Sequence, residues 1–295
     1  MKLIKPVTFQ DSQLISSNAT ETYAAYNSGT TYAKDAFVDY GTHIYQSLVN
    51  TNLNHQPDIS PTFWILIGPD NTHAMFDTQV STITTSSSPL NVTVAPGVNI
   101  NSAAFLELTG TQLVVTMTDG AGGPTVYTKT VSLDDTVLID WYGYFFDPYN
   151  PRTEVILTDL PPYPNGRLSM ALTGSGTIGI GVFTYGTVYD LGLTQYGASA
   201  GIKDYSVKET DQYGNTTFVE RAYSKRMESQ VFVQNSNIAF NQKLLASVRA
   251  TPCVWIGSED TQYNPLVVFG FYRSFNTTIS YPTYSLCSLE IEGLI

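Results

Sequence analysis

The chain reads LVVTM at Leu113–Met117 and RLSMAL at Arg167–Leu172. In both segments apolar side chains occupy alternate positions, which places them on one face of an extended strand. Similar short stretches recur from Asn91 to Thr184, separated by turn residues such as Asp119-Gly120 and Pro161-Pro162. Many short strands joined by frequent turns are typical of a β-sandwich or jelly roll. We therefore predict a mainly β protein with a β-sandwich over residues 72–200.

Three further segments flank this sandwich. Residues 1–19 form an N-terminal arm that either stays loose or completes a sheet edge, in its own sandwich or on another subunit. Residues 20–71 form a small aromatic β module, which must use its aromatic side chains as a core because so short a unit buries little surface. Residues 201–295 form an α+β module that opens with a hairpin around Tyr213–Asn215.

One clear helix is predicted, over residues 236–249. Ser236 is the candidate N-cap, and Pro252 prevents the helix from continuing. The segment 72–200, in contrast, shows no helical period, and residues 137–146 are predicted to form a strand. The apolar stripe of the helix consists of Ile238, Leu244, Leu245 and Val248.

The composition favours sheets and assemblies. Charged residues make up 13% of the 295 residues, about half of the usual ~25%. The 20 Tyr, 14 Phe and 3 Trp argue against disorder, so the polar surface must come from Thr, Ser, Asn and Gln. Neutral polar side chains lose less on desolvation than Lys or Glu, which suits subunit interfaces. The net charge of -11 argues against a nucleic-acid partner.

The two cysteines, Cys253 and Cys287, are too few for a disulfide framework. They could form one bridge or remain two buried thiols. The N-terminus lacks the apolar core of a signal peptide, so we predict reduced, buried thiols. No apolar run of ~18 residues is present, so we expect no membrane insertion.

No motif in the chain predicts a catalytic, cofactor or metal site. Gly174-Ser175-Gly176-Thr177-Ile178-Gly179 fits the dinucleotide pattern G-x-G-x-x-G, but the residues after it favour a strand, where a nucleotide site needs a helix. We interpret it as a glycine-rich sheet edge. None of His43, His55 and His73 lies in a metal-binding spacing with Cys, Asp or Glu.

Three carboxylate pairs leave glycoside hydrolysis open as a minor alternative, because that reaction needs two carboxylates at a set separation. All three pairs lie beside strand or turn signals, where Asp is common. Turn chemistry is the interpretation that we prefer. The pairs are Asp134 with Asp135, Asp140 with Asp147, and Glu259 with Asp260.

Residues 20–71 resemble the small chitin-binding type 3 carbohydrate-binding modules. The resemblance lies in Tyr26–Tyr32 (YNSGTTY), Ala36–Val38, Tyr45 and the closing Trp64. It implies a small β fold in which Tyr26, Tyr32, Tyr45 and Trp64 are either core residues or glycan-binding aromatics. Leu48-Val49 stands where many members expose paired tryptophans, which removes the flat rings on which a sugar would stack.

The whole chain is similar to a class of bacteriophage virion proteins. In these an arm like Lys2–Pro6 precedes such a module, and a phrase like Gly68–Thr72 leads into a β-sandwich. The stretches Pro96–Val98 and Leu160–Pro164 resemble galactose-binding-like jelly rolls. The C-terminal segment Glu220–Arg226 is similar to the same virion proteins.

This second resemblance implies a structural component of a phage tail, neck or baseplate, without enzymatic activity and without a cofactor. The expected location is the virion, and the expected partners are other virion proteins and further copies of the chain in a homo-oligomer. The alternative is a virion protein that binds carbohydrate on the host surface. A glycan-cleaving enzyme is the third reading.

Overall fold

The computed structural model describes residues 1–136, 140–146, 150–210 and 212–294. The fold is mainly β, as predicted. The chain packs into two compact units, and each is made of segments that are distant in the sequence. Unit 1 contains Met1–Thr8, Ile100–Ala103 and Tyr185–Ile295, and unit 2 contains Phe9–Asn99 and Ala104–Thr184. These units cut across the four segments expected from the sequence.

Unit 2 contains a five-stranded antiparallel sheet in the order β12-β11-β14-β9-β2. The two alternating segments form neighbouring strands, because Leu113 of β11 pairs with Leu172 of β14. Their apolar side chains are buried and the intervening ones are partly exposed, as the alternation predicts. The strands are β2 (Leu14–Ser17), β9 (Leu90–Val94), β11 (Gln112–Thr118), β12 (Thr125–Ser132) and β14 (Arg167–Thr173).

Unit 2 also holds the small aromatic module. Its three-stranded sheet has the order β4-β5-β7, and β3 pairs with β6 beside it. Elsewhere in unit 2, β8 (Thr84–Ser87) pairs with β15 (Thr177–Ile180). The module strands are β3 (Thr31–Tyr32), β4 (Phe37–Tyr40), β5 (His43–Ser47), β6 (Asn52–Leu53) and β7 (Trp64–Pro69), and the short 3-10 helices of the unit are η1 (Asp11–Gln13), η2 (Pro57–Ile59) and η3 (Ala74–Phe76).

The strand predicted over residues 137–146 is wrong where the structure describes it. Residues Trp141–Phe146 form the short helix α1, while residues 137–139 lie outside the described part. The sequence WYGYFF is rich in aromatic residues that favour strands, but it has no alternation of apolar and polar positions. Propensity alone therefore suggested the wrong element.

The sheet of unit 1 has the order β16-β1-β22-β23-β24-β21-β17, and β18 also pairs with β21. On the far side of β16 the order continues through β10 to β13. Both β10 and β16 begin in one unit and end in the other. The strands are β1 (Lys2–Pro6), β10 (Ser102–Leu106), β13 (Val155–Leu157), β16 (Val182–Asp190), β17 (Leu193–Thr194), β18 (Ser199–Asp204), β21 (Tyr223–Gln234), β22 (Cys253–Ile256), β23 (Val267–Thr278) and β24 (Tyr284–Gly293).

The expected arm of residues 1–19 is paired within its own chain. Strand β1 lies between β16 and β22, with Leu3 opposite Tyr189 on one side and Trp255 on the other. The alternative of pairing within the chain is therefore the one found, although β1 joins the sheet of unit 1 and not that of the sandwich. The rest of the segment continues into unit 2, where β2 pairs with β9.

The predicted helix is present as α2 (Ile238–Ser247), preceded by the 3-10 turn η4 (Asn235–Asn237). Ser236 is not its N-cap, because that position falls on Asn237, which makes no side-chain capping bond. The predicted apolar stripe is confirmed: Leu244, Leu245 and Val248 are buried and Ile238 packs against the same core. A second 3-10 helix of unit 1, η5, spans Thr261–Leu266.

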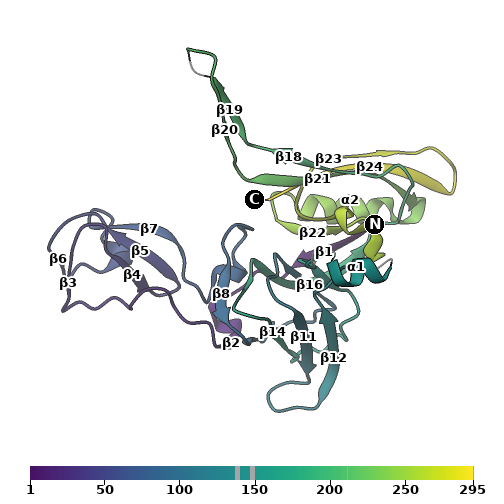
Figure 1. The fold of residues 1–295 in the computed structure, drawn as a ribbon. Helices are drawn as coiled ribbons and strands as arrows, with labels where there is room; N and C mark the ends of the chain where they lie inside the picture. Colours follow the sequence, from purple (N-terminus) through teal and green to yellow (C-terminus); the bar gives the residue numbers. More distant parts are fainter. Residues whose placement is uncertain (137–139, 147–149, 211, 295) are drawn as a thin grey trace. The chain divides into compact units, whose positions relative to one another are not determined.

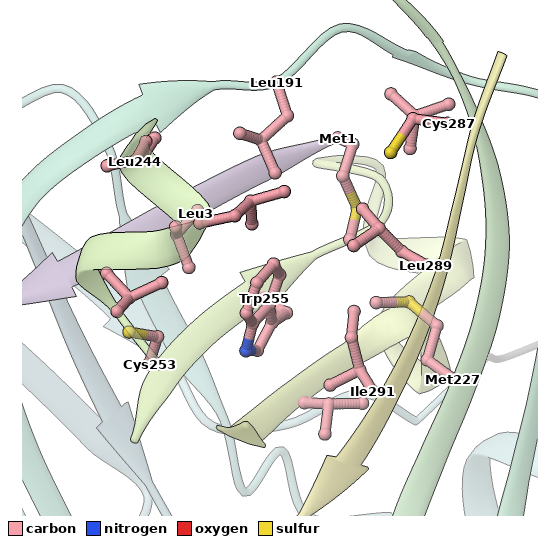
Figure 2. Close-up of a cluster of buried hydrophobic side chains, with 14 of the residues drawn as sticks. Met1, Leu3, Leu191, Met227, Leu244, Cys253, Trp255, Cys287, Leu289 and Ile291 are labelled. Atoms are coloured by element: carbon pink, nitrogen blue, oxygen red, sulfur yellow. The ribbon is translucent and has the colours of Figure 1, made fainter. Parts of the chain in front are cut away.

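The core of unit 1 gathers around Trp255. Figure 2 shows its indole near Leu3 of β1 and near Leu289 and Ile291 of β24. The indole Nε1 donates a hydrogen bond to the Gly270 carbonyl at 3.0 Å. Cys253 and Cys287 are free and buried in this core, as predicted.

The predicted hairpin is also present. Strands β19 (Val207–Thr210) and β20 (Thr216–Val219) pair in the register Val207 to Val219. They extend beyond the sheet edge formed by β18 and β21 (Figure 1).

Replacing Leu3 by Ala tests the central position of β1. Leu3 has no exposed surface, so we expect the free energy of unfolding to fall by roughly 2–5 kcal/mol. The matched control is Leu193→Ala, because that leucine is 72% exposed. Equal, small effects of both substitutions in chemical denaturation would show that β1 adds little to the fold.

Candidate functional site

Three of the four predicted aromatic residues form one cluster in the small module. Tyr26 and Tyr32 meet Trp64 edge-on, with ring centroids at 5.9 and 5.3 Å. The Trp64 side chain is only 2% exposed, and its Nε1 donates to the His55 carbonyl at 2.8 Å. Tyr45 makes a ring contact with Tyr40 at 6.4 Å.

This arrangement uses the aromatic rings as the core of the module. Trp64 is buried, and its ring partners are tyrosines of the module itself. A buried indole offers no flat face to a sugar ring. Neighbouring polar groups support the cluster, because Asn52 Nδ2 donates to Ser47 Oγ at 3.1 Å inside the module.

Sequence reasoning missed a group of three carboxylates, which belong to Glu21, to Asp39 of β4 and to Asp70 directly after β7. Oxygens of Glu21, Asp39 and Asp70 all lie within 4.8 Å of one another. Glu21 accepts hydrogen bonds from the backbone N of Asn71 at 2.9 Å and of Thr72 at 3.2 Å. The three acids come from widely separated positions, so no local spacing reveals them.

His73 belongs to the same group. Its Nδ1 lies 2.6 Å from Asp70 Oδ1, and its Nε2 lies 2.9 Å from Asp11 Oδ1. Burial opposes the charged imidazolium, but the hydrogen bonds to Asp70 and Asp11 outweigh it and raise the pKa of His73. From the sequence, no histidine lay in a metal-binding spacing with Cys, Asp or Glu. The one local sign that His73 contacts a carboxylate is its spacing of three residues from Asp70.

Asp39 is the least compensated member of the group. Burial, followed by the negative charges of Asp70 and Glu21, raises the pKa of Asp39 to about 6. Among the described residues its Oδ1 has no hydrogen-bond partner. A carboxylate in this position either takes up a proton or faces a cation, and a set of carboxylate oxygens is the donor set that hard divalent cations prefer.

The other motifs take local structural roles. Gly174 and Gly176 lie in the turn between β14 and β15, so a strand follows the glycine pattern. Asp134 Oδ1 accepts from the backbone N of Thr136, and Asp260 Oδ1 accepts from that of Gln262. Glu259 forms an ion pair with Lys2 at 2.6 Å. Asp147 lies outside the described residues. His55 stacks on Phe63, while His43 Nδ1 lies 2.9 Å from Thr42 Oγ1.

Large apolar side chains are exposed at three places that the sequence did not single out. On β7 they are consecutive, on α1 they are all aromatic, and on the hairpin one lies in the turn and one on β20. The exposed residues are Ile65, Leu66 and Ile67 on β7, Trp141, Tyr142, Phe145 and Phe146 on α1, and Tyr213 and Phe218 on the hairpin.

No helix among the described residues has the length and apolar character needed to cross a membrane. Comparisons with protein-family models, with curated proteins and with solved structures find no match to this chain.

Replacing Trp64 by Ala should lower the free energy of unfolding by roughly 3–5 kcal/mol, because a fully packed indole is lost. Ile59→Ala, at an exposed position of the same module, is the control and should have little effect. A loss below about 1 kcal/mol in denaturant titrations would contradict a core role for Trp64.

Replacing Asp39 by Asn should change stability in a pH-dependent way. The folded-state pKa of about 6 lies above the ordinary value of 3.8, so protonation favours the fold. This contribution is complete below the ordinary pKa and is lost as the pH rises through about 6. The variant, which is neutral at every pH, should therefore melt higher than the wild type above pH 6 and similarly near pH 4.

Thermal unfolding in the presence of a chelator measures the Asp39 effect, with Asp35→Asn in the same module as the control. A variant that melts lower than the wild type above pH 6 would contradict the assignment. It would show that the Asp39 carboxylate is a needed ligand or acceptor.

Proposed function

We propose that this chain is a non-enzymatic structural component of a tailed-bacteriophage particle, in its tail, neck or baseplate, and that it assembles with copies of itself and with other virion proteins. The observation that carries the assembly role is the hairpin of β19 and β20, together with β18 at its base. All of β18 and β20 is exposed, and so is β19 except for the half-buried Val207.

A two-stranded hairpin with water on both faces is marginally stable on its own. Two of its large side chains would also gain from cover, since Tyr213 is 81% and Phe218 is 76% exposed. Tyrosine and phenylalanine are enriched in the cores of protein interfaces. The hairpin therefore suits a contact that is completed by another subunit.

The module offers a second surface of this kind. Strand β7 is the outer strand of the β4-β5-β7 sheet, and Ile65, Leu66 and Ile67 are exposed along it. An outer strand with exposed apolar side chains is a template for pairing with another chain. Soluble proteins normally protect such an edge. A partner that covers β7 accounts for the apolar side chains that are exposed along it.

The charge distribution favours contacts between unlike surfaces. Unit 2 carries fifteen acidic and four basic residues, whereas unit 1 carries ten of each. Two copies of unit 2 therefore repel each other, while unit 1 can approach unit 2 of another copy without that penalty. Contacts between unlike surfaces build rings when they close, and filaments when they do not.

The assignment to a phage particle rests on the resemblance of the arm, module and C-terminal segments to virion proteins. Lys2–Pro6 and Gly68–Thr72 carry that resemblance. Glycan binding by the virion is the alternative, but the buried Trp64 gives no support to a sugar site on the cluster of aromatic rings.

Sedimentation velocity of the full-length protein tests the assembly role. We expect concentration-dependent oligomers, and we expect the double variant Tyr213→Ser, Phe218→Ser to weaken them. Ile279→Ser is the control, because Ile279 is equally exposed and lies outside the hairpin. The proposal would be overturned if the protein stayed monomeric at every concentration and mass spectrometry did not find it in purified phage particles.

A further inference from the structure

We propose that a polar groove on the sheet of unit 1 binds carbohydrate that is neutral or carries an amino group. The groove lies over β21, β24 and β23 at the side where β17 turns into β18. Its volume is about 510 Å³, within the ~300–1,000 Å³ typical of small-ligand sites. This site is separate from the aromatic module; its lining includes Ser199 of β18 but no residue of the hairpin strands β19 and β20.

The floor of the groove is a row of polar side chains fixed by strand register. Glu228 lies opposite Glu290, and Gln230 lies opposite Ser288, across β21 and β24. Ser274 of β23 adjoins Glu290 on its other side. Glu228 and Gln230 are exposed while Met227 and Val231 on the alternate positions are buried, so the polar row faces solvent.

An arginine keeps the two carboxylates in place. Cross-strand neighbours of like charge normally destabilise a sheet, but Arg226 Nη2 lies 2.6 Å from Glu228 Oε1 and 2.8 Å from Glu290 Oε1. Both contacts use Oε1, so Oε2 of each carboxylate keeps its capacity to accept. Hydrogen bonds from hydroxyl groups to such ionised acceptors are stronger than those between neutral groups.

Tyr196 supplies an aromatic ring at the rim. It is fully exposed and lies in the turn after β17, where Gly197 has a φ of 97°. Only glycine adopts this conformation readily. The turn is tied to the floor because the backbone N of Gln195 donates to the Gln230 carbonyl at 2.8 Å. A fully exposed tyrosine has no role in the core of unit 1.

The chemistry of the lining selects the ligand class. Acceptors and hydroxyls in a row match the hydroxyl groups of a sugar, and an exposed ring matches its apolar face. Glu228 and Glu290 disfavour phosphate or acidic sugars, because the neighbouring Arg226 and Arg273 are both already paired with carboxylates. Apolar ligands gain little from a lining that is mostly polar.

Saturation-transfer NMR of the full-length protein tests the site, with glucose, galactose, glucosamine, N-acetylglucosamine and glucuronic acid as probes. We expect saturable binding of at least one neutral or amino sugar and none of glucuronic acid. Tyr196→Ala and Gln230→Ala should each weaken binding about tenfold, which corresponds to about 1.4 kcal/mol. Tyr213→Ala, at an exposed tyrosine on the hairpin, should leave it unchanged.

The opposite results overturn the proposal. No binding to any probe, binding unaffected by Tyr196→Ala, or a preference for glucuronic acid would each do so. Circular dichroism of the variants shows whether they fold. The oligomeric state is measured separately, so failure of the sugar site and failure of the assembly role are distinguishable.

Discussion

The pairing of β1 between β16 and β22 is the constraint on which unit 1 depends. It joins the first residues of the chain to Gly186–Asp190 and to Val254–Ile256. Without β1, both neighbouring strands would have an open edge in the middle of the sheet. Leu3 also contributes to the core around Trp255. Closing such long loops is costly in entropy, and the burial of β1 must offset that cost.

The aromatic module solves a different problem with few residues. A short unit cannot bury much aliphatic surface, so two tyrosine rings pack edge to face against Trp64 and the indole N–H is satisfied by a carbonyl. The consequence is functional as well as structural. The Trp64 ring, which is buried in the core, is lost as a recognition surface, whereas Tyr26, Tyr32 and Tyr45 are half-buried.

The two units differ in surface charge and in the features that they expose. Unit 2 carries the whole net negative charge, and its carboxylate group at Glu21, Asp39 and Asp70 concentrates part of it beside His73. Unit 1 is neutral and holds both the exposed hairpin and the polar groove. In the proposed function the hairpin serves assembly, while the groove meets a ligand from outside the particle.

By itself the sequence determined the mainly β character, the strands around Leu113 and Leu172, the hairpin at Tyr213–Asn215 and the helix at Leu244 and Leu245, because these depend on local periodicity and turn residues. Tertiary structure alone decided that β1 is a central strand, since pairing partners nearly two hundred residues away leave no local pattern. The same reason applies to the carboxylate group and to the groove, which are built from distant residues by strand register. The helix α1 was missed because its aromatic run satisfies no periodicity, so only its surroundings in the folded chain could decide its form.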